Sequence, residues 1–171
     1  MTSIPHGFRW ATLEAPELRR HVRRERAIDE AVASMCSGGL TLVGASRCGK
    51  TALACALLRH WEARHHRRGL FASAERLAVA RDDFGMGRGE AYEVAHAMET
   101  PLLVLDGLGS ESNPVMNAVP HVIYERYNSG LPTRVTTWMT PEHVARRYNP
   151  CIARRLFEPG RIAVIACGGA P

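Results

Sequence analysis

Lysine is almost absent from this chain of 171 residues, because only Lys50 is a lysine among its 22 Lys and Arg residues. Aromatic side chains make up only 6% of the residues, so a base-stacking platform for single strands is not evident. No apolar run approaches the roughly 20 residues that span a membrane, and residues 1–10 contain no apolar signal segment. The sequence therefore predicts a cytoplasmic protein without a membrane anchor.

The five cysteines also lack the paired spacing of a metal or redox motif. Because their number is odd, we expect reduced thiols, as in a cytoplasm. The chain is long enough for one domain with a hydrophobic core, and its 46% apolar and 23% charged residues are ordinary for a globular protein. The formal charge of +5 is compatible with an anionic partner besides a nucleotide.

The single lysine lies in a segment that fits the phosphate-binding pattern G-x-x-x-x-G-K-[ST]. In such loops, backbone N–H groups and one compact ammonium contact the phosphates. A planar guanidinium is too wide for that place, which explains why a lysine is kept there. The sequence therefore predicts a nucleoside triphosphate site at Gly44, Ala45, Ser46, Arg47, Cys48, Gly49, Lys50 and Thr51.

The segments around the motif have the order that phosphate binding requires. Residues 40–43 are typical of a buried strand, and residues 51–64 have the apolar spacing of a helix. Residues 101–106 predict a second apolar strand, which ends in Asp106. We expect Lys50 to contact phosphate, and Thr51 and Asp106 to hold Mg²⁺.

Strands and helices alternate along the rest of the chain, which predicts a parallel sheet covered by helices on both faces. Residues 1–16 are expected to form an irregular arm, and residues 17–171 a single α/β domain without a lid domain. Further strands are expected at residues 70–72, 134–137 and 161–166. Helices are expected at residues 17–35, 74–81, 91–98, 115–128, 141–148 and 152–157, and a glycine-rich loop at residues 82–90.

Four later segments resemble the DnaC-type helicase loaders and the IstB-type transposition helpers, namely Leu102–Gly109, Tyr124–Tyr127, Leu131–Thr137 and Ile152–Leu156. With the phosphate loop, the resemblance extends from about Ile4 to Ala166. It implies a P-loop ATPase of the AAA+ (ASCE) class, a three-layer sandwich with a mostly parallel five-stranded sheet. Members bind ATP and Mg²⁺, assemble on DNA and act on a helicase or transposase.

The same resemblance implies an arginine finger at Arg155, next to Arg154. Such an arginine reaches into the nucleotide site of a neighbouring subunit and stabilises the charge of the transition state. The role therefore requires a homo-oligomer.

The sequence departs from the family at three places. Gly107 occupies the position of the acid that orients the attacking water, and Glu111 is either its substitute or a solvated loop residue. Trp138 replaces a polar sensor with an indole, which has one donor and no acceptor, so we expect it to pack in the core or in an interface. Arg47 replaces a glycine, and it contacts phosphate, a neighbour or water. The first two changes predict slow hydrolysis with binding intact.

Two other functions stay open. A P-loop kinase for a small molecule would need a lid of arginines, for which the candidates are Arg146, Arg147, Arg154 and Arg155. Alternatively, a non-hydrolysing, nucleotide-gated adaptor is favoured by Gly107 and Trp138. The basic stretches at residues 19–26 and 59–68 are either sequence-independent contacts to single-stranded DNA or solvated helix faces.

Overall fold

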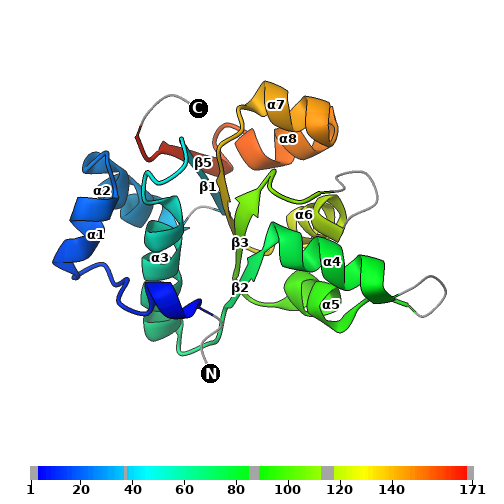
Figure 1. Cartoon of the computed structure of the whole chain (residues 1–171), viewed down its shortest axis with the longest axis horizontal. Coiled ribbons are helices and arrows are strands. Elements are labelled where there is room, and N and C mark those ends of the chain that lie inside the picture. Colours follow the sequence, from blue (N-terminus) through cyan, green and yellow to red (C-terminus); the bar gives the residue numbers. More distant parts are fainter. Residues whose placement is uncertain (1–3, 37, 85–88, 113–117, 169–171) are drawn as a thin grey trace.

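The computed structural model describes residues 4–36, 38–84, 89–112 and 118–168 (Figure 1). The first elements are η1 His6–Phe8, α1 Pro16–His21, α2 Arg26–Ala33, η2 Ser34–Cys36, β1 Gly39–Val43, α3 Lys50–His65, β2 Leu70–Ser73, α4 Ala74–Phe84 and α5 Tyr92–Glu99. They are followed by β3 Leu103–Leu108, α6 Ala118–Asn128, β4 Thr133–Thr137, α7 Pro141–Arg147, α8 Pro150–Phe157 and β5 Ile162–Ala166.

The five strands form one parallel sheet in the order β2-β3-β4-β1-β5. The predicted α/β class and five-stranded sheet are thereby confirmed. Strand β4 lies between β1, which leads into the phosphate loop, and β3, which carries Asp106. Because the strands are parallel, the carboxyl ends of all three lie at the same edge of the sheet.

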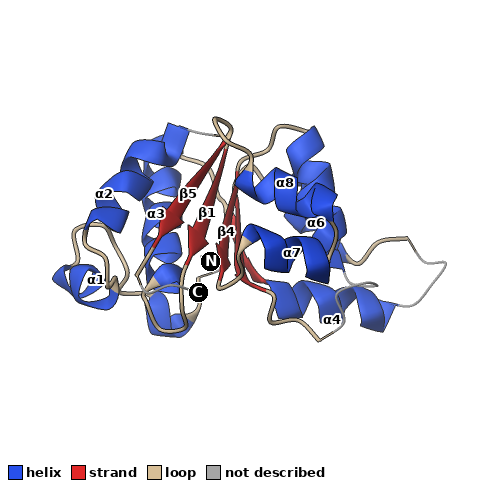
Figure 2. Cartoon of the chain, turned by 90° about the horizontal axis from the view of Figure 1, so that it is seen from above, coloured by secondary structure: helices blue, strands red, loops and turns tan. Residues whose placement is uncertain are grey.

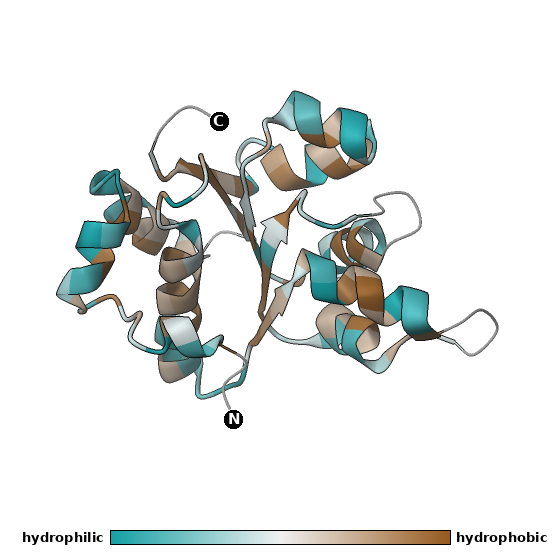
Figure 3. Cartoon of the chain, viewed as in Figure 1, coloured by the Kyte–Doolittle hydropathy of each residue, from teal (hydrophilic) through white to brown (hydrophobic). Residues whose placement is uncertain are grey.

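Helices cover both faces of the sheet and give three layers, with α1 to α3 on one face and α4 to α8 on the other (Figures 1 and 2). Alternate residues of β3 enter different cores: Val104 packs with α3, whereas Leu103 and Leu105 pack with the second layer. A strand that is buried on both faces needs a continuous apolar run. Figure 3 shows these apolar strands between helices whose outer sides are hydrophilic.

The predicted single helix over residues 17–35 is wrong, because the chain leaves the helical conformation between α1 and α2. Val22 is extended, with φ −83° and ψ 106°. Beyond it, Arg23 N donates to Cys48 O at 3.4 Å and Arg24 N donates to Cys167 O at 3.2 Å. Apolar residues keep helical spacing on both sides of the break, so the hydrophobic periodicity of the sequence does not indicate where the helix ends.

The strand predicted to end at Asp106 instead continues to Leu108 as β3. Its register with β4 is irregular between Leu105 and Leu108, where Gly107 has a φ of +74°. Glycine adopts this left-handed conformation without steric cost, so it permits the bulge. The sequence pattern marked the apolar run but not the two residues that extend it.

The expected loop at residues 82–90 is partly wrong, because α4 continues to Phe84. Gly85 and Gly87 of that loop, and residues 115–117 of the helix expected at 115–128, lie outside the described residues. Within the described residues, no helix is long and apolar enough to cross a bilayer. The four cysteines with described side chains, Cys48, Cys55, Cys151 and Cys167, are free thiols.

A buried arginine ties the end of α5 to the start of β4. Arg126, on α6, is fully buried and donates to Thr100 O at 2.8 Å and to Pro132 O at 2.7 Å. It also donates to Ala97 O at 2.9 Å and to Thr133 Oγ1 at 2.8 Å. Burial lowers the pKa of the guanidinium to about 10. Carbonyl dipoles thus satisfy this charge in place of a carboxylate.

Replacing Arg126 by Met is expected to lower the free energy of unfolding by about 2–4 kcal/mol, because several buried carbonyl groups lose their donor. Urea denaturation measures this change. The matched control is Arg154→Met on the exposed face of α8, which should stay within about 0.5 kcal/mol of the parent. Equal stabilities of the two variants would contradict a structural role for Arg126.

Candidate nucleotide-binding site

The phosphate loop connects the carboxyl end of β1 to the start of α3. Its last residue, Gly49, has a φ of +92°, and a Cβ there would lie 2.5 Å from His21 O. The loop therefore needs a glycine at this position for space as well as for conformation. The first turn of α3 has no acidic residue and no side-chain cap, so its N–H groups remain available to an anion.

Lys50 lies at the beginning of α3 and points back into the loop. Its Nζ donates to Gly44 O and to Ala45 O, each at 2.7 Å, and lies 3.7 Å from Cys48 Sγ. The ammonium is thus half-buried among groups of the loop itself. Arg47 has a φ of +61°, a left-handed conformation that glycine adopts more easily, and its side chain is exposed.

Thr51, Asp106 and Thr136 form one hydrogen-bonded cluster, although they come from α3, β3 and β4. Thr51 Oγ1 donates to Asp106 Oδ1 at 2.9 Å, and Thr136 Oγ1 donates to the same oxygen at 2.7 Å. Gly107 N in turn donates to Thr136 Oγ1 at 2.9 Å. The two predicted metal residues are therefore in contact. Their hydroxyl and carboxylate oxygens are the hard donors that fit Mg²⁺.

Two cavities flank Lys50. One has a volume of about 440 Å³ and is lined by Phe8 and His21 from the N-terminal segment. The other, of about 450 Å³, is lined by the ends of β3 and β4, including Gly107 and Trp138. Sequence reasoning missed the first of these cavity walls, because Phe8 and His21 belong to no motif and are far from the loop in the sequence.

No family model and no curated protein matches the sequence. Among solved structures, a DnaC helicase loader has a TM-score of 0.74 and 22% identity over 94% of this chain and 99% of that one. DnaI has a TM-score of 0.71 and 22% identity, over 96% of this chain and 92% of the DnaI chain. The replication initiator DnaA, bound to AMPPCP and single-stranded DNA, has a TM-score of 0.62 and 20% sequence identity. The match covers 88% of this chain and 50% of that DnaA chain.

The chain has the fold of the DnaC-type AAA+ domain. The predicted resemblance to the DnaC type is therefore confirmed at the level of the fold, whereas that to IstB stays a prediction. Because identities of 20–22% carry the fold alone, the role of each residue in this AAA+ domain must come from its geometry.

The interpretation of Glu111 as a solvated loop residue is wrong, whereas its role as a substitute base stays a prediction. Its side chain is 1% exposed and accepts from Gly109 N at 3.1 Å and from the Tyr148 hydroxyl. Arg147 Nε lies 3.8 Å away. Burial, and then the bond to Glu111, raises the pKa of Tyr148. Glu111 thus anchors the loop after β3 to the end of α7.

Trp138 is 47% exposed, so the expectation that it packs in the core is wrong. It follows β4 directly, lines the cavity beside Gly107 and contacts the His143 ring at a centroid distance of 5.8 Å. The adjacent hydroxyls are engaged by the sheet, since Thr137 Oγ1 donates to Leu108 O at 2.9 Å. The indole therefore lies beside the polar end of the candidate site without supplying an acceptor.

Arg155 lies at the opposite end of the sheet from the phosphate loop of its own chain. It lines a small cavity with Gly39, Thr133 and Ile162, which begin β1, β4 and β5. The length of β1, roughly 16 Å at 3.3 Å per residue, separates this end from Gly44. Arg155 therefore cannot serve its own site. Arg147 is held at Glu111, so two of the four arginines proposed for a kinase lid, Arg147 and Arg155, are engaged away from Lys50.

Replacing Glu111 by Gln is expected to destabilise the fold by about 1–2 kcal/mol, because the buried carboxylate accepts charge-assisted hydrogen bonds. Thermal and urea unfolding measure this loss. Binding of a fluorescent ATP analogue to the folded variant should be unchanged.

Ser112→Ala, at an exposed neighbouring position, is the control and should leave stability unchanged. Unaltered stability of Glu111→Gln together with lost ATP turnover would instead identify Glu111 as a base.

Proposed function

We propose that this chain binds ATP and Mg²⁺ and acts as a slowly hydrolysing AAA+ ATPase on DNA, together with a helicase or transposase. The observation that carries the proposal is the contact between Thr51 and Asp106 directly beside Lys50 at the carboxyl edge of the sheet. Ligands of parallel α/β sheets bind at this edge. The fold supports the same class, because its structural neighbours include a helicase loader and an AMPPCP-bound initiator.

The phosphates would lie on the N–H groups of residues 45–51, with Lys50 released from its carbonyl partners to contact them. Thr51 and Asp106 would hold the Mg²⁺, which neutralises charge on the phosphate oxygens when it is bound. The aromatic wall of Phe8 and His21 would take the base, since the cavity that they line begins at the loop.

Slow turnover is supported by the two positions after Asp106 at which an acid could orient the attacking water, Gly107 and Glu111. Gly107 has no side chain, and Glu111 is committed to Tyr148. Trp138 cannot accept a proton from water. The same observation favours the second candidate, an adaptor in which ATP binding alone switches the conformation.

DNA contact is supported by exposed arginines on α1, on α2 and in the segment between them, among them Arg20, Arg23 and Arg26. Two others in this region are paired, because Arg24 binds Glu30 at 2.5 Å and Arg19 lies 3.5 Å from Glu25. The exposed guanidinium groups in this region would attract DNA phosphates without sequence preference. One of the structural neighbours is a DnaA bound to single-stranded DNA, which supports the same class of partner.

Asp106→Asn is expected to weaken the binding of ATP with Mg²⁺ on the order of 10- to 100-fold, because it removes the charged oxygen donor. In EDTA, ATP should bind this variant and the parent equally. Lys50→Ala should lose ATP binding under both conditions. Calorimetric titration measures these affinities, and Asp82→Asn, at an exposed position of α4, is the matched control. Equal losses for Asp106→Asn in Mg²⁺ and in EDTA would contradict its role with the metal.

A homo-oligomer with a trans arginine finger predicts complementation between two inactive variants. Lys50→Ala and Arg155→Ala should each abolish ATP turnover that single-stranded DNA stimulates, whereas Arg154→Ala should retain it. A mixture of the two inactive variants should regain part of the turnover, because some interfaces then pair an intact Lys50 with an intact Arg155.

A mixture that stays inactive would exclude the trans finger. Absence of turnover in the parent chain, despite ATP binding that depends on Lys50, would favour the adaptor.

A further inference from the structure

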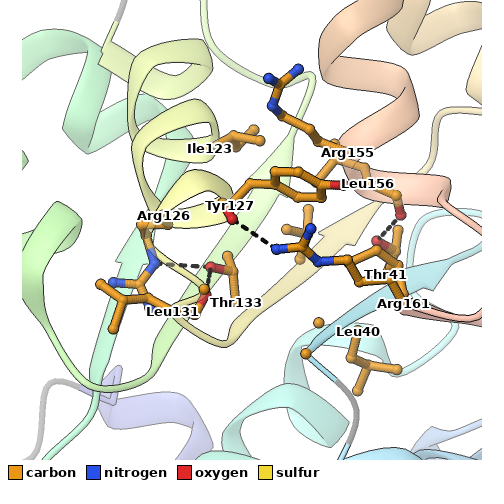
Figure 4. A pocket seen from close by; sticks show the side chains of 15 residues that line it. Leu40, Thr41, Ile123, Arg126, Tyr127, Leu131, Thr133, Arg155, Leu156 and Arg161 are labelled. Carbon is orange, nitrogen blue, oxygen red and sulfur yellow. Dashed lines mark hydrogen bonds between the residues drawn. The ribbon is translucent and has the colours of Figure 1, made fainter.

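The end of the sheet opposite the phosphate loop contains a small, partly open cavity with several arginines. Its volume is about 50 Å³, and its walls include Arg126, Tyr127, Arg155 and Arg161 (Figure 4). Arg126 is committed to the carbonyl groups described above. The other two arginines approach aromatic rings of α6, and no carboxylate lines the cavity.

The guanidinium of Arg155 contacts the rings of two tyrosines, which are three residues apart on one face of α6. Its Cζ lies 4.5 Å from the centroid of the Tyr124 ring and 5.1 Å from that of Tyr127. Arg161 lies on the other side of Tyr127, with Cζ 3.8 Å from the ring centroid (Figure 4). Such contacts attract the cation electrostatically and cover the flat face of the guanidinium.

The main chain that carries Arg155 is also fixed. Thr41 Oγ1 of β1 donates to Leu156 O at 2.7 Å in a buried bond. Arg161 Nη2 donates to Tyr127 O at 2.9 Å, and the Tyr127 hydroxyl bonds to Glu158. These three bonds fix both ends of the segment from Leu156 to Arg161 against β1 and α6.

The head of Arg155 retains donors that can bind an anion. Only Nη1 has a hydrogen bond, to Cys151 O of its own helix at 3.1 Å. Contacts to the ring face leave the edge of the guanidinium uncovered. Because Arg155 Nε is buried, the donors left for the oxygens of a phosphate are those of the terminal Nη groups. The side chain is thus ordered before any ligand arrives, and binding then loses less conformational entropy.

We propose that Tyr124 is a positioning residue, which holds the guanidinium of Arg155 ready for the terminal phosphate of ATP bound to a second copy of the chain. The inference rests on the proposed function and adds to it the residue that orients the finger. Tyr124 suits this role because it is 44% exposed and belongs to the surface. Tyr127 is held by Glu158 and supports the fold.

The test compares the DNA-stimulated ATP turnover of Tyr124→Ala, Tyr124→Phe and Arg155→Ala. Tyr124→Ala should lower kcat about tenfold, a size typical of a lost cation–π contact, with KM for ATP unchanged. Tyr124→Phe keeps the ring and should restore kcat. In the Arg155→Ala background, Tyr124→Ala should have no further effect. Tyr92→Ala, at a tyrosine that is 74% exposed on α5, is the control.

A second readout covers a chain that binds ATP without turnover. Self-association with AMPPCP and an oligothymidine is followed by sedimentation, and Tyr124→Ala and Arg155→Ala should both shift it to higher protein concentration. If Arg155→Ala changes both readouts but Tyr124→Ala changes neither, the positioning role is overturned and the finger stands. If Arg155→Ala is also without effect, the finger itself fails. Faster turnover in Tyr124→Ala would instead mean that the ring restrains Arg155.

Discussion

Two hydroxyls that donate to the same oxygen of Asp106 connect the main parts of the candidate site. Thr51 comes from the helix after β1, and Thr136 comes from β4. Their meeting depends on the strand order, because β4 lies between β1 and β3. Parallel strands bring their carboxyl ends to one edge, so three distant segments contribute to one oxygen cluster.

The sheet has two chemically different ends. At the carboxyl end, Lys50, free N–H groups and the Asp106 cluster surround space for an anion and a metal. At the other end, Arg155 rests on tyrosines of α6 and is excluded from its own phosphate loop by the length of β1. Under the proposed function, a second copy of the chain would supply the arginine that completes the site, and nucleotide chemistry would then be coupled to assembly.

The loop after β3 bears on hydrolysis rather than on nucleotide binding, because it holds the positions at which an acid could orient a water. Gly107 permits the bulge of β3, but it leaves no carboxylate near an attacking water. The next acid, Glu111, is buried against Tyr148 and stabilises the loop. Trp138 then covers the outer side of the same cavity. Under the proposed function, the groups expected to bind phosphate and metal are therefore in place, while the positions after Asp106 offer no acid that is free to activate water.

The sequence alone determined the features that depend on residues close together along the chain, namely the phosphate loop and the buried strands. The spacing from Gly44 to Thr51 specified the phosphate loop, and the apolar runs specified the strands, because a doubly buried strand needs continuous apolar side chains. The pair Thr51 and Asp106 could also be foreseen, since parallel strands share an edge. The family resemblance gave the five-stranded sheet that the structure confirms.

Only the tertiary structure decided the features that depend on distant partners. The break after Val22 arises from bonds to Cys48 and Cys167, and the burial of Glu111 from Tyr148. The stacking of Arg155 likewise needs α6, which lies about thirty residues earlier in the sequence. No periodicity or motif records such contacts, because each is made between segments that the sheet brings together.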